Sequence, residues 1–180
     1  MSCCSKCTFR CGASKVVFGD GNPEAEIMFI GEAPGKKEGE TGLPFMGSSG
    51  RILDKMLESI KLKREDIYIT NICKCRLPEN RDPLPEEIHE CWPWLEKQIK
   101  IIDPKIIITL GRYALNCFLS EAKISEVHGQ IINIHIKKIG TRKIFPLHHP
   151  AAARINRKTR AVFEEDFKKI PAILKNKKEH

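Results

Sequence analysis

The sequence lacks several features that would place it in other classes of protein. It contains no apolar run close to the roughly 18 residues that a bilayer-spanning helix requires. Residues 1–6 lack the apolar core of a signal peptide, so we expect a cytoplasmic protein without a membrane partner. No internal repeat and no long linker interrupts the chain, which favours a single domain over residues 1–180 with a cysteine-bearing N-terminal lead.

Aromatic residues are scarce at 7%, whereas hydrophobic residues make up 41% and charged residues 30% of the chain. That composition excludes a disordered chain and a coiled coil. Lys and Arg total 31 against 23 Asp and Glu, and the formal net charge of +8 favours a polyanionic partner. A solvated, lysine-rich surface would give the same charge, so both interpretations stay open.

Apolar residues follow strand-like and helix-like patterns in turn along the chain. The patterns predict strands over 25–30, 67–70, 105–110 and 143–147, and helices over 48–60, 84–102, 112–120 and 159–175. Residues 131–136 alternate and predict an extra edge strand or hairpin. Because apolar strands that alternate with helices form covered parallel sheets, we predict an α/β fold. Its form is a three-layer α/β/α sandwich around a mostly parallel four-stranded sheet.

Unusual sequences follow the predicted strands. In open α/β sheets, ligands bind just beyond the carboxyl ends of the strands. Residues 31–35 (GEAPG), Asn71, Gly111 and His149 all lie at such ends. The first of these segments is not a P-loop, because it has three residues between its glycines and no Ser or Thr after Lys36. We therefore expect a ligand site at this edge that does not bind a nucleoside triphosphate.

Three side chains near these ends have chemistry suited to a nucleobase. The planar amide of Asn71 matches the edge of uracil, with its O4 acceptor and N3–H donor, and mismatches cytosine. His149 could donate a hydrogen bond to a developing anion, and Phe45, in a loop rich in Gly and Pro, could stack on a base. Each has a structural alternative: an Asn that caps a turn, a structural His and a Phe that fills the core.

Eight cysteines lie at positions 3, 4, 7, 11, 73, 75, 91 and 117. Disulfides are rare in cytosolic proteins, so a metal site is a better interpretation than disulfides, although the spacing favours a metal site and no site about equally. The pairs Cys4 with Cys7 and Cys75 with Cys91 provide four thiolates, which suit zinc and a four-iron cluster equally well. Neighbouring cysteines could substitute for these ligands, and Cys117 is expected to be a small core residue.

An ordered series of segments links these observations. It comprises residues 16–23, 31–38, 42–47, 70–76, 80–83 and 149–152. The series resembles the family 4 uracil-DNA glycosylases, the iron–sulfur branch of the uracil-DNA glycosylase superfamily. The resemblance covers roughly residues 4–170, and the order of the motifs makes it specific.

The resemblance implies a monofunctional DNA glycosylase of base excision repair. Such an enzyme flips uracil out of single- or double-stranded DNA and hydrolyses its N-glycosidic bond, which leaves an abasic site. By the resemblance, Phe45 stacks on the flipped uracil and Asn71 reads its edge. Glu38 stands near C5 and helps to exclude the methyl group of thymine.

The resemblance also assigns the groups around the bond that breaks. His149 stabilises negative charge on the uracil O2, and the backbone of Glu32 and Ala33 lines the O2 side. Some related enzymes carry an Asp where this chain has Ala33. An alanine side chain cannot act as a base. Glu32 is therefore a candidate to orient or activate the water. The alternative is an unaided water that is held by backbone groups.

The same resemblance implies a structural [4Fe-4S] cluster held by Cys4, Cys7, Cys75 and Cys91. It would tie the N-terminal lead to the segment around residues 75–91. The alternative of a different class is a metal-stapled nucleic-acid-binding module without catalysis, which needs the cysteines and the charge but not Asn71.

We expect a basic segment to contact the DNA beside the flipped base. Arg154, Arg157 and Lys158 would meet phosphates, and either Arg154 or Ile155 would fill the space left in the stack. A monomer is expected, and whether a sliding clamp is a partner stays open.

Overall fold

The computed structural model describes residues 15–175 and contains one mixed sheet with the strand order β1-β3-β2-β4-β6-β5. The strands are β1 (Asp20–Gly21), β2 (Ile27–Gly31), β3 (Tyr68–Asn71), β4 (Ile106–Leu110), β5 (Ile132–Ile136) and β6 (Gly140–Leu147). The four inner strands run parallel, and the edge strands β1 and β5 pair antiparallel with β3 and β6. The predicted parallel core of four strands is confirmed, but the sheet has six strands. The edge strand at 131–136 was predicted, whereas the two residues of β1 are too few to give a pattern.

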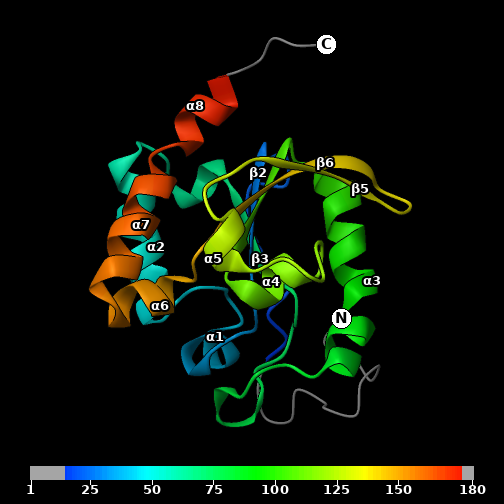
Figure 1. Cartoon of the computed structure of the whole chain (residues 1–180). Helices are drawn as coiled ribbons and strands as arrows, with labels where there is room; N and C mark the ends of the chain where they lie inside the picture. Colours follow the sequence, from blue (N-terminus) through cyan, green and yellow to red (C-terminus); the bar gives the residue numbers. More distant parts are fainter. Residues whose placement is uncertain (1–14, 176–180) are drawn as a thin grey trace.

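Helices cover both faces of the sheet. They are α1 (Lys36–Thr41), α2 (Ser48–Ser59), α3 (Pro85–Ile102), α4 (Arg112–Asn116), α5 (Ile124–Val127), α6 (Pro150–Ile155), α7 (Arg157–Phe167) and α8 (Ile170–Lys175). Two 3₁₀ turns, η1 (Arg64–Asp66) and η2 (Pro78–Asn80), lie in the connections. Helices α2, α6 and α7 lie on one side of the sheet and α3 lies on the other (Figure 1). This is the predicted α/β/α arrangement.

Strand β2 shows why the sheet needs cover on both faces. All five of its residues are buried, and successive side chains point to opposite faces. Phe29 packs against Phe167 of α7, with ring centroids 5.9 Å apart. Met28 and Ile30 belong to the second core, together with Leu95 of α3. The apolar run therefore joins two separate hydrophobic cores.

The helix predicted over 159–175 is divided into two. Helix α7 ends at Phe167, and α8 begins at Ile170 and carries Pro171 as its second residue. Proline has no backbone N–H and disfavours a helical conformation at the residue before it. The apolar pattern continues across the break because Phe163, Phe167 and Ile170 all face the same core.

The inner strands end at the same edge of the sheet. Gly31 ends β2 directly opposite Asn71, which ends β3. Gly111 follows β4, and His149 follows β6 as the N-cap residue of α6. The parallel register therefore brings together the strand ends that the sequence marked as unusual. Within residues 15–175, no helix is both long and apolar enough to span a membrane.

The contact between Phe29 and Phe167 predicts the largest effects on stability. Phe167 is 0% exposed, so Phe167→Ala should lower the free energy of unfolding by about 3–5 kcal/mol. The matched control Ile101→Ala removes a side chain that is 78% exposed and should change it by less than about 0.5 kcal/mol. Denaturant titration followed by circular dichroism measures both changes. Equal effects of the two substitutions would contradict this description of the core.

Candidate functional site

A cavity of about 640 Å³ opens beyond the carboxyl ends of the inner strands. Six residues that the sequence analysis singled out line it: Ala33, Glu38, Phe45, Asn71, His149 and Arg154. They come from the loop after β2, from α1, from the loop before α2, from the end of β3, and from α6 with its N-cap residue. Residues from five separate segments of the sequence therefore share one cavity.

Asn71 faces this cavity with an uncommitted amide. The residue is 2% exposed, and within the described residues its side-chain amide has no hydrogen-bond partner. A Cβ atom on Gly31 would lie 2.4 Å from Asn71 Oδ1 and 2.6 Å from Phe45 Cζ. Only glycine at position 31 lets the amide and the ring approach each other in this way. Because Asn71 lines the cavity and its amide is not bonded to another described side chain, the amide is free to bind a ligand there.

Lys74 anchors the strand end behind Asn71. Its ammonium donates hydrogen bonds to the Asn71 carbonyl at 2.7 Å, to Thr70 Oγ1 at 2.7 Å and to Gln98 Oε1 at 2.6 Å. An ammonium has three N–H donors, so these acceptors satisfy it completely. Burial lowers the pKa of Lys74 to about 7, and the sulfurs of Cys91 and Cys73 oppose that change when they are ionised. The sequence analysis missed Lys74, because nothing in its neighbourhood marks a buried lysine.

His149 is a neutral hydrogen-bond donor. The backbone N–H of Ala151 donates to His149 Nδ1 at 3.1 Å, so the proton of the neutral ring is on Nε2. Burial lowers the pKa of His149 to about 4, which keeps the ring uncharged near neutral pH. Gly111, at a φ of 88°, leaves room beside it, since a Cβ there would lie 3.0 Å from His149 Cβ.

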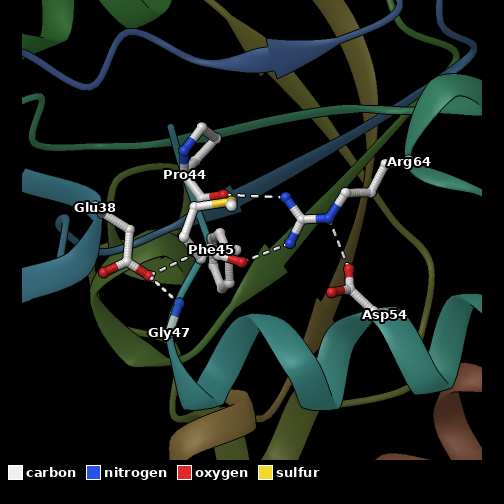
Figure 2. Close-up of polar contacts among 7 residues, drawn as sticks. Glu38, Pro44, Phe45, Gly47, Asp54 and Arg64 are labelled. Carbon is white, nitrogen blue, oxygen red and sulfur yellow. Dashed lines mark hydrogen bonds and ion pairs between the residues drawn. The ribbon is translucent and has the colours of Figure 1, made fainter. Parts of the chain in front are cut away.

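The Phe45 ring lies beside the His149 ring, with centroids 6.1 Å apart and an interplanar angle of 33°. Glu38 holds the loop that carries Phe45, as Figure 2 shows. Its Oε1 accepts hydrogen bonds from the N–H groups of Met46 at 2.8 Å and Gly47 at 2.9 Å. Gly47 is the N-cap of α2, where a carboxylate also interacts favourably with the helix dipole. Glu38 therefore lines the cavity and fixes its wall.

Glu32 is oriented differently from its neighbour Ala33. Among the described residues, Ala33 lines the cavity and Glu32 does not. Burial and, to a smaller extent, the charge of Asp82 raise the pKa of Glu32 to about 7, and Arg112 opposes both effects. Asp82 and Arg112 form an ion pair of 2.8 Å with each other. The Glu32 carboxyl therefore lies toward charged groups at the side of the cavity, and part of it is protonated near neutral pH.

The three basic residues predicted to meet DNA are separated. Arg154 lines the cavity, whereas Arg157 and Lys158 are exposed at the start of α7 and are not among its lining residues. A second hollow of about 330 Å³ adjoins the cavity and shares Arg154 and Arg51 with it. Lys55 also lines this hollow. The sequence analysis missed Arg51 and Lys55 because α2 has the pattern of an ordinary amphipathic helix.

Two of the four predicted metal ligands, Cys4 and Cys7, lie outside the described residues. Cys75 and Cys91 are each 9% exposed. A hydrogen bond from Cys73 lowers the pKa of Cys91 to about 6, and the same bond raises the pKa of Cys73 above its usual range. Cys91 is therefore a ready thiolate, the form that binds soft metals. Residues 15–175 contain no group of three or more potential metal ligands, so they supply at most half of a four-thiolate site.

Comparisons with known proteins agree with this geometry. A family model for the uracil DNA glycosylase superfamily matches residues 18–171. The chain is 45% identical to the type-4 uracil-DNA glycosylase of Sulfurisphaera tokodaii, across 93% of this chain and 78% of that protein. It is 43% identical to the Archaeoglobus fulgidus type-4 uracil-DNA glycosylase, across 97% and 89% of the two chains. The type-4 uracil-DNA glycosylase of Saccharolobus solfataricus is 44% identical, across 97% and 83%.

Proposed function

Because the chain belongs to the type-4 uracil-DNA glycosylases of the uracil DNA glycosylase superfamily, we propose that it removes uracil from DNA. The bond between C1′ of the deoxyribose and N1 of the base breaks, and water supplies the hydroxyl group at C1′. Free uracil and an abasic site are the products. The observation that carries this proposal is the single cavity that Asn71, His149 and Phe45 line together.

The cavity would receive one base outside the helical stack. Extruding a base costs a few kcal/mol. Stacking on an aromatic ring returns roughly 1–3 kcal/mol, and Phe45 is the aromatic residue in the cavity wall. The proposed platform for the flipped uracil is therefore the Phe45 ring.

Asn71 would select the base. Its Nδ2 would donate to O4 of uracil and its Oδ1 would accept from N3–H, whereas cytosine presents the reverse pattern. A site built to hydrogen-bond its substrate can reject a mismatched analogue by roughly 10⁴–10⁵. Glu38 would limit the space near C5, where thymine carries its methyl group, by fixing the 45–47 loop.

His149 would stabilise the leaving group. As the glycosidic bond breaks, negative charge develops on the uracil O2, and the neutral Nε2–H of His149 would donate to it. One preorganised donor of this kind contributes roughly 2.7–4 kcal/mol in the transition state. The bond from Ala151 supports this role, because it fixes the tautomer before the substrate binds.

The water would be activated by Glu32 or held by backbone groups alone. Ala33, the residue of this motif that lines the cavity, has no side-chain base. Glu32 lies beside it, with a pKa near the range in which a general base is most effective. The dependence of the rate on pH distinguishes the two mechanisms.

A [4Fe-4S] cluster on Cys4, Cys7, Cys75 and Cys91 completes the proposal. The thiolate character of Cys91 and the near-complete burial of Cys75 fit such a group. The cluster would supply no chemistry to the reaction and would hold the N-terminal lead against the segment around residues 75–91.

DNA would cross the cavity mouth along the basic residues. Arg154 would contact the backbone at the flipped nucleotide, and Arg157 and Lys158 would contact it farther along. Arg51 and Lys55 extend this positive surface across the adjoining hollow. We further propose a cytoplasmic monomer, for which a sliding clamp is a candidate partner.

Asn71→Ala tests the function and its alternative together. The substitution removes both hydrogen bonds to the base, so uracil release should fall by roughly 10²-fold or more. Binding to uracil-free DNA, measured by fluorescence anisotropy, should not change. The control Asn133→Ala alters an exposed residue of β5 and should leave both readouts unchanged. No uracil release by the unaltered protein would favour the non-catalytic binding module.

Glu32→Gln tests the base. If the Glu32 carboxylate activates water, the single-turnover rate should rise about tenfold per pH unit below pH 7 and level off above it. The rise occurs because only the deprotonated form can accept a proton. Glu32→Gln should be slow and should lack this step, whereas His149 stays neutral throughout because its pKa is about 4. Identical pH profiles for the two proteins would assign the water to backbone groups.

Absorbance and iron analysis test the cluster. A four-iron cluster absorbs near about 400 nm, whereas d¹⁰ zinc does not. Cys91→Ser should lose the absorbance and the bound iron, because Cys91 is a proposed ligand. Cys117→Ser should keep both, since Cys117 packs against the second core. A colourless protein that contains zinc would show that the site is not an iron–sulfur centre.

A further inference from the structure

Arg64 of η1 reaches the loop that carries Phe45 from the side opposite Glu38 (Figure 2). Its Nη1 donates to the Pro44 carbonyl at 3.1 Å, and its Nη2 donates to the Phe45 carbonyl. Its Nε donates to Asp54 Oδ1 of α2 at 2.6 Å. The guanidinium therefore joins two consecutive backbone carbonyls of the loop to the helix that follows it.

The loop is held through its backbone on both sides. Glu38 accepts the N–H groups of Met46 and Gly47, while Arg64 donates to the two carbonyls just before them. Four consecutive residues, 44–47, are thus bound by two charged side chains. Neither side chain touches the Phe45 ring in these bonds, so both act on the backbone from which the ring projects.

Phe45 needs this support because its backbone is strained. Its φ of 54° lies in the left-handed region, which is unusual for a bulky residue and costs of order 1–3 kcal/mol. Strain of this kind persists only where the surroundings determine the conformation. Gly50 adds a further constraint, since a Cβ there would lie 1.6 Å from the Phe45 carbonyl oxygen. The loop must therefore pack against α2 while Arg64 binds that same oxygen.

We propose that Arg64 is a positioning residue that holds the Phe45 ring where it stacks on the extruded uracil; this proposal rests on the proposed function. The guanidinium acts through the carbonyls of Pro44 and Phe45, and Asp54 orients it by binding Nε. The role requires the planar fork of arginine, because one ammonium cannot span the same three acceptors in the same geometry.

The contacts of Arg64 with the loop carbonyls determine the position of the Phe45 ring. A reacting group displaced by about 1 Å can lose 10²-fold in rate even when the chemistry is intact. Without Arg64 the left-handed conformation of Phe45 has less support and the ring moves away from the base. Binding of undamaged DNA, in which no base is flipped, should not depend on this contact.

The experiment compares Arg64→Met and Arg64→Lys with the matched control Arg142→Met. Arg142 is also a half-buried arginine that pairs with an aspartate, Asp103, and it lies on β6 at the end far from His149. Both Arg64 variants should lose roughly 10–100-fold in single-turnover uracil release. They should also be inhibited less strongly by free uracil, while the control keeps its activity and loses similar thermal stability.

A double-mutant cycle shows whether the effect passes through Phe45. Once Phe45→Ala has removed the ring, adding Arg64→Met should slow the reaction by less than about twofold. If the two losses instead multiply, Arg64 acts on its own, for example by binding a phosphate, and the proposal is wrong. Full activity of Arg64→Lys, or of Arg64→Met, would also overturn it.

A readout that needs no activity separates this proposal from the proposed function. With 4-fluorophenylalanine incorporated, the ¹⁹F resonance that disappears in Phe45→Leu belongs to position 45. Arg64→Met should shift or broaden that resonance and Arg142→Met should leave it unchanged. An unaltered resonance in Arg64→Met refutes the positioning role. If the ¹⁹F resonance changes as expected but the unaltered protein releases no uracil, the proposed function is wrong and the positioning of Phe45 by Arg64 still holds.

Discussion

The site depends on the missing side chain at Gly31. This residue ends the central strand β2 in register with Asn71, and the Asn71 amide and the Phe45 ring both occupy the space where a Cβ would lie. A parallel sheet brings strand ends close together, but ordinary side chains at those ends would keep the functional groups apart. Glycine at this position changes an edge of the sheet into a cavity wall. The amide and the ring can therefore face one guest.

The side chains proposed to face the base and the side chains that hold the cavity wall differ in charge. Asn71 is neutral, and His149 is neutral because burial lowers its pKa to about 4. The charged side chains of Lys74, Arg64 and Glu38 bind backbone atoms around the cavity. In the proposed reaction, neutral side chains suit a neutral base, and the negative charge that develops on O2 would be stabilised by the oriented donor His149. These charged side chains fix the geometry of the cavity wall, because they hydrogen-bond to carbonyl and N–H groups of its backbone.

Much of this arrangement could be predicted from the sequence. Asn71 and His149 follow apolar strands, and Phe45 lies in a Gly- and Pro-rich loop, so local patterns were enough to select them. Arg64 and Lys74 could not be found in that way. Arg64 contacts the loop 19 and 20 residues before it and binds carbonyl oxygens, which every residue has. Glu32 shows another limit of prediction from the sequence. Neighbouring residues of one motif point in different directions, and only the backbone conformation decides that Ala33 rather than Glu32 lines the cavity.

The short segment from Asn71 to Cys75 links the cavity to the cysteines. Lys74 donates hydrogen bonds to Gln98 of α3 and to the Asn71 carbonyl. The neighbouring Cys73 is a free thiol that hydrogen-bonds to Cys91, which also lies on α3. The segment therefore contacts α3 at two residues, the side-chain amide of Gln98 and the thiol of Cys91. A metal bound at Cys75 and Cys91 would add a third connection between the segment and α3. Asn71 begins this segment. Contacts that hold the segment against α3 therefore also fix the backbone of Asn71, and with it the position of its side-chain amide. Cys73, Cys75 and Cys91 do not line the cavity, but two of them belong to the same short segment as Asn71.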